Sequence, residues 1–263
     1  MNIVVMGDSI TEGLGVKRSG KTYANLLQDK LLTVYSKPFE IINLGSSAMQ
    51  IDESRIRYEE QILGQVNVKV VIIAHGITEA IVRPKKEQLK YLPRRWRKPG
   101  WTDPRPYYSR KFLRRMFEML ESGIRWRTKA FLIRLFGGEK WMPIDQFAKH
   151  LSDCTRMLLN DNRDLHVIYL SPIDIEEKYF PHSKESLKQY KEQLNEICGR
   201  LGSRVHLCDA SLSLHRWSDY FEDRFHPNEQ GHEKIADALL RTIMENSIYV
   251  ELDEMTDRFA ERF

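Results

Sequence analysis

Residues 2–9 read Asn-Ile-Val-Val-Met-Gly-Asp-Ser, and this stretch determines how the rest of the chain is interpreted. Asn2 to Met6 is short, apolar and rich in β-branched residues, and Gly7 ends it, which is typical of a buried strand. A strand without polar alternation suits a parallel sheet that helices cover on both faces. Ser9 would then stand at the carboxyl edge of that sheet.

Strand and helix patterns alternate along the remaining chain. Further apolar strands are expected over residues 39–43, 68–74, 165–170 and 204–207, and helices with one apolar face over 22–34, 183–201 and 228–244. This alternation predicts one α/β domain over 1–263, with three layers and a flavodoxin-like five-stranded parallel sheet in the order 2-1-3-4-5. The functional site of such a sheet lies beyond the carboxyl ends of the strands.

A second polar cluster, Asp223-Arg-Phe-His226-Pro-Asn, precedes the last predicted helix. A serine hydroxyl is a poor nucleophile until a base removes its proton, and histidine suits that role near neutral pH. The imidazole in turn needs a carboxylate on its other nitrogen. Asp223, three residues before His226, could supply it across one turn, although a turn histidine satisfied by its neighbour would look the same in isolation.

Two motifs at opposite ends of the chain resemble those of the SGNH (GDSL-type) hydrolases. Gly7-Asp8-Ser9-Ile10-Thr11 is similar to the first block of that family, and Asp223-x-x-His226-Pro227-Asn228, followed by Gly231-His232, is similar to the last. The resemblance covers residues 1–82 and 145–245. It implies an esterase or acyl-transfer enzyme with Ser9 as nucleophile, His226 as general base and Asp223 as the residue that orients it.

The oxyanion hole implied by this resemblance departs from the family pattern. The family draws its donors from the nucleophile N–H, a glycine N–H in block two and an asparagine side chain in block three. Here Ala48 stands at the expected glycine position, with Gly45 as the alternative, and Thr78 replaces the asparagine. Ser9, Ala48 and Thr78 are therefore the expected donors. Because Ala48 and Thr78 replace the family residues, an enzyme with weakened catalysis remains an alternative. Three neighbouring residues are expected to support the site: Asp8, His75 and Glu79.

A basic segment interrupts the α/β pattern between the third and fourth strands. Residues 83–140 contain 18 Lys and Arg against 5 Asp and Glu, a net of +13 in a chain whose net charge is +4. We expect residues 83–142 to form a helical subdomain or lid with two amphipathic helices, starting near Phe112 and Trp126. Three interpretations stay open for it: a structural subdomain whose charged face is only solvated, an element that binds an anionic membrane surface, and one that binds an anionic or lipid-linked glycan. No nucleic-acid motif accompanies the charge.

Four cations near the start of this segment are the candidates for substrate recruitment: Arg94, Arg95, Arg97 and Lys98. The chain opens without a basic segment and a long apolar stretch, so we expect a cytoplasmic protein that a partner could hold at a membrane surface. Neither a metal nor a cofactor is expected, because no His/Cys cluster has ligand spacing. The oligomeric state is left open.

Two rival functions deserve a test. Residues 15–22, Gly-Val-Lys-Arg-Ser-Gly-Lys-Thr, match the Walker A pattern and would indicate a P-loop kinase. They do not directly follow a strand, which argues against this reading. A non-catalytic glycan-binding module with the same fold is the other rival. The favoured hypothesis is a serine-dependent carboxylic-ester hydrolase or acyltransferase that acts on O-acetyl groups of a carbohydrate.

Overall fold

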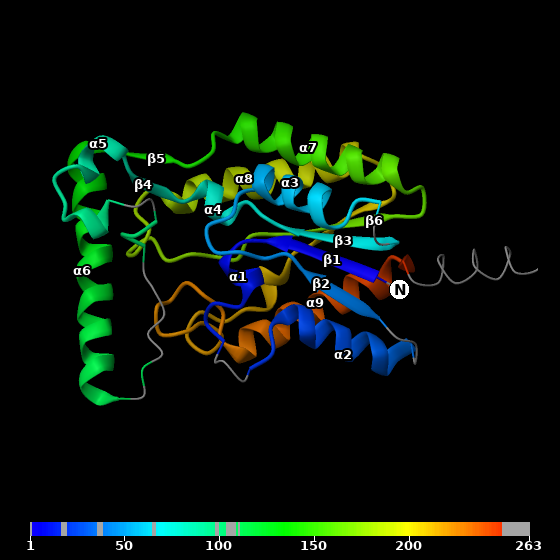
Figure 1. The fold of residues 1–263 in the computed structure, drawn as a ribbon, viewed down its shortest axis with the longest axis horizontal. Helices are drawn as coiled ribbons and strands as arrows, with labels where there is room; N and C mark the ends of the chain where they lie inside the picture. The colour runs from blue at the N-terminus through cyan, green and yellow to red at the C-terminus, as the bar shows by residue number, and fades with distance from the viewer. Residues whose placement is uncertain are drawn as a thin grey trace, which may run out of the picture.

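The computed structural model describes residues 2–16, 20–35, 39–64, 67–97, 100–103, 109 and 111–248, and Figure 1 shows their arrangement. Five parallel strands form the central sheet in the order β2-β1-β3-β6-β7. Their bounds are β1 (Asn2–Gly7), β2 (Glu40–Asn43), β3 (Val68–Ala74), β6 (His166–Leu170) and β7 (Val205–Cys208). Numbered within this sheet alone, the order is 2-1-3-4-5, so the predicted fold is confirmed.

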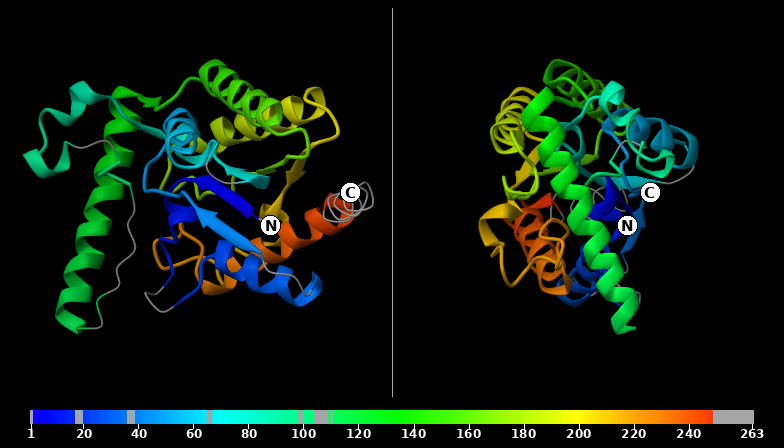
Figure 2. Two further views of the ribbon diagram at one scale, coloured as in Figure 1. Left: turned by 45° about the vertical axis from the view of Figure 1, so that its right-hand side comes forward. Right: turned by 90° about the vertical axis from the view of Figure 1, so that its left-hand side faces the viewer.

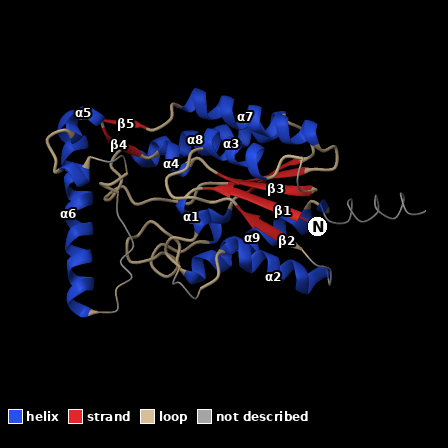
Figure 3. Cartoon of the chain, viewed as in Figure 1, coloured by secondary structure: helices blue, strands red, loops and turns tan. Residues whose placement is uncertain are grey.

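Helices cover both faces of the sheet (Figures 1 and 3). On one face lie α2 (Tyr23–Tyr35) and α9 (Glu229–Glu245), and on the other α3 (Ile51–Gln61), α7 (Ile144–Asp161) and α8 (Ser183–Arg200). Neither α3 nor α7 was expected from the sequence. Helix α3 buries only Ile51, Ser54 and Tyr58, so it has almost no apolar stripe. Helix α7 does carry one, from Phe147 through Leu151 to Leu158.

The sheet sets where the polar motifs meet. Val5 of β1 pairs with Asn43 on β2 and with Ile72 on β3, and both Val5 and Ile72 are fully buried. Farther along, Gly7 pairs with Ala74, so β1 and β3 end side by side. The segments that follow these two strands therefore emerge at the same edge of the sheet.

The long connection between β3 and β6 is more structured than expected. It contains α4 (Ile77–Ala80), β4 (Val82–Pro84), α5 (Lys86–Leu89), the 3-10 turn η1 (Arg94–Trp96), α6 (Phe112–Phe136) and β5 (Gly138–Lys140). Strands β4 and β5 form an unanticipated antiparallel pair. The expectation of two helices is wrong: α6 is one helix that continues through Gly123, since a single glycine costs a helix only about 1 kcal/mol.

Helix α6 stands across the carboxyl edge of the sheet (Figure 1). In the right-hand view of Figure 2 it crosses in front of the other elements. The remaining short elements, α1 (Ser9–Glu12) and η2 (Ala210–Ser213), follow β1 and β7. Among the described residues, none of the helices combines the length and the apolar character needed to cross a membrane.

A buried charge cluster attaches α6 to the rest of the molecule. Asp103 receives hydrogen bonds from Arg83 Nε at 2.8 Å and from Lys129 Nζ, on α6, at 2.6 Å. Lys129 is fully buried, and its ammonium lies 4.1 Å from the centre of the Phe180 ring. One carboxylate thus joins two cations from different parts of the β3–β6 connection, one at β4 and the other on α6.

Burial and charge act in opposite directions within this cluster. Burial alone would raise the pKa of Asp103, but Arg83 and Lys129 outweigh it and hold that pKa below its usual range. Burial lowers the pKa of Lys129 to about 8, because the charged form loses its hydration. Asp103 is therefore the partner on which both cations depend.

We predict that Asp103→Asn destabilises the protein more than Lys129→Met does. Removing the carboxylate leaves two buried cations uncompensated, which typically costs about 3–5 kcal/mol. In Lys129→Met, Asp103 keeps its ion pair with Arg83. Urea unfolding curves of both variants provide the measurement, and an equal loss in the two would show that Asp103 is not the centre of the cluster.

Lys129 also predicts a dependence of stability on pH. Its pKa in the folded protein is about 8, below that of an unfolded lysine, about 10.4. Between these values the unfolded chain binds more protons, so the Lys129 contribution to the free energy of unfolding increases with pH. We expect wild type to gain stability relative to Lys129→Met between about pH 7 and about pH 10, followed by urea midpoints. A constant difference would contradict this assignment.

Candidate active site

Ser9 lies at the first position of α1, two residues after β1 ends. Asp8 caps this short helix by accepting a hydrogen bond from the Ile10 N–H at 3.0 Å. The sharp turn requires Gly7, because a Cβ atom there would lie 2.0 Å from Thr11 Oγ1 and 3.0 Å from Ala74 O. The turn places the Ser9 hydroxyl beyond the sheet edge.

The turn before α9 supplies the histidine and its carboxylate. Asp223 Oδ2 lies 2.7 Å from His226 Nδ1, while its Oδ1 accepts the backbone N–H groups of Phe225 and His226 at 3.0 and 3.1 Å. Both members of the pair are buried. Because the carboxylate accepts at Nδ1, His226 carries its ring proton there, and Nε2 is left as an acceptor.

Ser9 and His226 meet across the carboxyl edge. Ser9 Oγ lies 3.0 Å from His226 Nε2, so Ser9, His226 and Asp223 form one continuous hydrogen-bonded chain. The three residues that the sequence singled out are therefore together in the structure. In this arrangement a proton can leave the serine hydroxyl for a histidine that a buried carboxylate stabilises when charged.

The Walker-like segment has a different local role. Gly15 has φ 99°, and a Cβ atom there would lie 2.2 Å from Pro227 O and 2.9 Å from His226 Cβ. A glycine is thus needed for the chain to pass the histidine turn. Lys21 forms an ion pair with Asp29 on α2. Residues 17–19 of the segment lie outside the described residues.

The expected oxyanion donors differ in whether they already have a hydrogen-bond acceptor within the protein. Thr78 Oγ1 donates to Asp8 Oδ2 at 2.6 Å, so its single proton is already directed to a carboxylate. The Gly45 N–H donates to Asn43 Oδ1 at 2.8 Å, so the alternative donor is also engaged. The N–H groups of Ser9 and Ala48 have no partner among the described residues, and Ala48 has φ 64°, the left-handed conformation that favours glycine.

The supporting residues form a buried network behind Ser9. Glu79 accepts the N–H groups of Ile51 and Gly76, both at 2.9 Å, which joins the start of α3 to the start of α4. His75 Nε2 lies 2.7 Å from the Ser54 hydroxyl, and its Nδ1 lies 3.3 Å from Glu79 Oε1. These groups hold backbone segments in place.

The pKa values of the two carboxyl groups beside Ser9, those of Asp8 and Glu79, shift in opposite directions. Burial raises the pKa of Asp8, and hydrogen bonds from Thr78 and the Ile10 N–H oppose this increase only in part. Burial acts in the same direction on Glu79, but there His75 and backbone N–H groups outweigh it and lower the pKa. Glu79 is therefore the carboxylate whose charge the network stabilises.

Arg83 lies next to the site, although from the sequence it was expected only as the start of the basic segment. Its Nη1 donates to Thr78 O at 2.7 Å, its Nε donates to Asp103, and its guanidinium lies 3.6 Å from the centre of the Trp141 ring. It thus connects block three to the α6 region. Its burial was not predicted, because Arg83 opens a segment rich in cations, and Lys85 and Lys86 follow it closely.

The predicted recruitment residues are only partly described. Arg94 and Arg97 are exposed, and Arg97 Nε donates to Leu92 O at 2.9 Å. Lys98 and the side chain of Arg95 lie outside the described residues. Their recruiting role remains a prediction.

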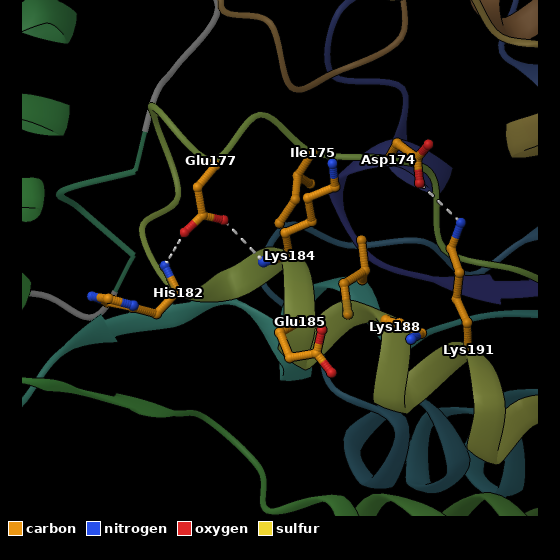
Figure 4. Close-up of a pocket in the computed structure, with 9 residues that line it drawn as sticks. Asp174, Ile175, Glu177, His182, Lys184, Glu185, Lys188 and Lys191 are labelled. Carbon is orange, nitrogen blue, oxygen red and sulfur yellow. Dashed lines mark hydrogen bonds and ion pairs between the residues drawn. The ribbon is translucent and has the colours of Figure 1, made fainter.

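A cavity of about 600 Å³ lies at the start of α8. Figure 4 shows that acidic and basic side chains line it together, and Ser9 and His226 are not among them. Lys191 pairs with Asp174 at 3.1 Å, and Glu177 accepts the N–H of His182 at 2.5 Å. No group of three or more His, Cys, Asp or Glu residues arranged to hold a metal occurs within the described ranges.

The model of the GDSL-like lipase/acylhydrolase family matches residues 5–234 of the chain. This range includes all three residues of the hydrogen-bonded chain and the whole of the β3–β6 connection. No curated protein sequence matches the chain.

Several solved structures share the fold. A lipase/acylhydrolase from Enterococcus faecalis is 14% identical, with a TM-score of 0.61, over 92% of this chain and 94% of the other. The acetyl xylan esterase AlAXEase is 18% identical, with a TM-score of 0.58, over 91% and 98%. Axe2, an acetylxylan esterase from Geobacillus stearothermophilus, is 18% identical, with a TM-score of 0.57, over 92% and 93%. At these identities the likeness establishes the fold alone.

The contact between Thr78 and Asp8 generates a prediction for Thr78→Val. Loss of the hydroxyl leaves a buried carboxyl without one donor, so we expect a stability loss of about 1–3 kcal/mol. Turnover of a small ester should fall by less than about tenfold, because a true oxyanion donor is worth about 10²–10³. Urea unfolding and steady-state kinetics provide the two measurements, with Thr78→Ser as the control. A loss of 100-fold or more in folded Thr78→Val would return Thr78 to the oxyanion hole.

Proposed function

Because this chain belongs to the GDSL-like lipase/acylhydrolase family, we propose that it is a serine-dependent carboxylic-ester hydrolase or acyltransferase. In this proposal Ser9 is the nucleophile, His226 is the general base and Asp223 orients the imidazole. One observation carries the assignment: the continuous chain of hydrogen bonds, 3.0 and 2.7 Å long, from the Ser9 hydroxyl through His226 to Asp223.

The first half of the proposed reaction forms an acyl-enzyme. His226 Nε2 takes the hydroxyl proton as Ser9 Oγ attacks the ester carbonyl, and the Asp223 carboxylate stabilises the resulting imidazolium. The tetrahedral intermediate places a negative charge on the former carbonyl oxygen. We assign its stabilisation to the backbone N–H groups of Ser9 and Ala48, which have no other partner among the described residues. His226 then returns the proton to the departing alcohol.

The second half determines whether the enzyme hydrolyses or transfers. His226 takes a proton from the acceptor as the acceptor oxygen attacks the acyl carbonyl. The bond between the acyl carbon and Ser9 Oγ then breaks, and His226 returns the proton to Ser9 Oγ. Water as the acceptor gives hydrolysis, and a sugar hydroxyl gives acyl transfer. These steps use only side chains and backbone groups of the chain itself.

We propose an O-acetyl group on a carbohydrate as the substrate. Two of the similar structures are named acetyl xylan esterases, which supports this class by analogy of fold. Arg94 and Arg97 are exposed on either side of Trp96 in the chain, and their guanidinium groups offer hydrogen-bond donors for a sugar. We retain Arg94, Arg95, Arg97 and Lys98 as proposed recruitment residues.

One observation favours the second candidate, a catalytically weakened glycan-binding module. Thr78 replaces the family asparagine and its hydroxyl is directed to Asp8, so the side-chain oxyanion donor is missing from this arrangement. The intact Ser9–His226–Asp223 chain favours an active enzyme. A P-loop kinase is disfavoured, because Gly15 packs against the histidine turn and Lys21 pairs with Asp29.

We predict that Ser9→Ala and His226→Ala each abolish turnover of p-nitrophenyl acetate, since each removes a reacting group. Asp223→Asn should retain partial activity, because the base remains but its orientation is degraded. Labelling by a fluorophosphonate probe should require Ser9. Steady-state rates and probe labelling of the purified variants provide the measurements.

Lys21→Ala is the matched control, because it removes the Walker-like lysine without touching the hydrogen-bonded chain. It should keep the wild-type rate, and magnesium–ATP should not raise the melting temperature. A saturable increase with ATP would favour the kinase. Wild-type rates in Ser9→Ala would refute the serine mechanism, and a wild-type protein without turnover or labelling would favour the binding module.

A further inference from the structure

The outer side of α6 carries a continuous apolar stripe. Six large side chains spaced three, four or seven residues apart lie on one side of the helix, each between 50% and 66% exposed: Leu113, Phe117, Leu120, Ile124, Phe131 and Leu135. This spacing places them in one line along a helix. From Leu113 to Leu135 the stripe is about 33 Å long at a rise of 1.5 Å per residue. We name these six residues the α6 stripe.

The opposite side of α6 holds the helix against the molecule. Lys129 bonds to Asp103, and Arg125 donates to Trp101 O and lies 3.6 Å from the centre of the Trp101 ring. Trp126 meets the ring of Tyr179 edge-on, with centroids 5.1 Å apart. Because these contacts fix the inner side, the α6 stripe cannot turn inward to reach the core.

The charges on α6 distinguish between classes of partner. The helix has six cations and two acids, a net of +4. Both acids are already paired within the helix, Glu118 with Arg114 and Glu121 with Arg125. Arg127 and Arg134 are exposed beside the stripe, and neither forms an ion pair with a described residue. The outer side therefore combines apolar side chains with uncompensated positive charge.

We propose that the α6 stripe is a docking surface for a lipid bilayer that contains anionic headgroups. A helix with one apolar side and flanking arginines lies in the plane of such an interface, with its apolar side chains below the headgroups. Each cation near an anionic surface adds attraction that salt screens. A soluble protein face would need acidic groups to match Arg127 and Arg134 and an apolar groove to match the stripe.

The position of α6 relates this surface to the candidate active site. Arg115 on α6 pairs with Glu222, next to Asp223, and Lys129 lies against Phe180. The Phe180 ring contacts Phe225, whose ring in turn contacts His226. A bilayer on the outer side of α6 would lie at the carboxyl edge of the sheet, where β1 ends and α1 begins with Ser9 (Figure 1). The docking proposal stands on the exposed stripe and does not require the proposed chemistry.

The test uses the full chain and co-sedimentation with vesicles. The probes are phosphatidylcholine vesicles with and without phosphatidylglycerol. The stripe variant combines Leu113→Gln, Phe117→Gln, Leu120→Gln and Ile124→Gln, because glutamine removes the apolar surface and keeps helix propensity. The matched control replaces four exposed apolar residues away from α6 by glutamine: Leu32, Val34, Ile56 and Leu212.

Wild type and the matched control should bind the phosphatidylglycerol vesicles at least about tenfold more tightly than the stripe variant. Arg127→Gln with Arg134→Gln should weaken binding and flatten its salt dependence. All of these variants should turn over p-nitrophenyl acetate at the wild-type rate, so failure of the docking proposal and failure of the serine mechanism are separate results.

Three outcomes would overturn the proposal: wild type that does not sediment with either vesicle, a folded stripe variant that binds as wild type does, or a stripe-dependent dimer in sedimentation velocity without vesicle binding. If the stripe variant loses helix in circular dichroism, Phe117→Trp with Leu32→Trp as control replaces it. Brominated lipid should then quench the added tryptophan at position 117 and not the one at position 32. Equal quenching at both positions would also overturn the proposal.

Discussion

The hydrogen bond between Ser9 and His226 joins residues 217 positions apart, and the sheet is what brings them together. In a parallel sheet every strand ends at the same edge, so a turn after the first strand and a turn before the last helix face one another. Substitutions that loosen β1 would therefore separate the serine from its base without touching either residue. The site depends on the sheet order more than on any local motif.

The sequence was sufficient for the sheet because its signals are local and strong. Five short apolar runs predicted all five strands of the main sheet, and the boundaries of β3 agree with the structure. The juxtaposition of Ser9, His226 and Asp223 followed from the motif pair, since both motifs flank elements whose directions were predictable. Catalytic residues can be located from a sequence when the predicted fold places them at the carboxyl edge of the sheet.

Other features could not be predicted, because they depend on tertiary contacts. Helix α3 is strongly charged, and Ile51 and Tyr58 are buried only because β1 and α7 lie beneath them. By resemblance, the Thr78 hydroxyl was expected to donate to the oxyanion. In the structure it donates to Asp8, a carboxylate 70 residues away in the chain. The continuity of α6 through Gly123 was also not predicted, although a single glycine costs a helix only about 1 kcal/mol. The apolar stripe of α7 is visible in the sequence, but the helix was not predicted.

The basic segment illustrates why charge in a sequence is a weak guide to function. Among its cations, Arg83, Arg125 and Lys129 are buried and hold the segment together, while Arg127 and Arg134 remain at the surface. Net charge counts both kinds equally, although only the exposed kind can attract a partner. The buried cations have a different consequence. Lys129 on α6 bonds to Asp103, Asp103 bonds to Arg83, and Arg83 donates to the carbonyl of Thr78, one residue before Glu79. A force that moves α6 would therefore reach the segment behind Ser9 through two hydrogen-bonded side chains, so the same helix that presents the apolar stripe is mechanically joined to the candidate active site.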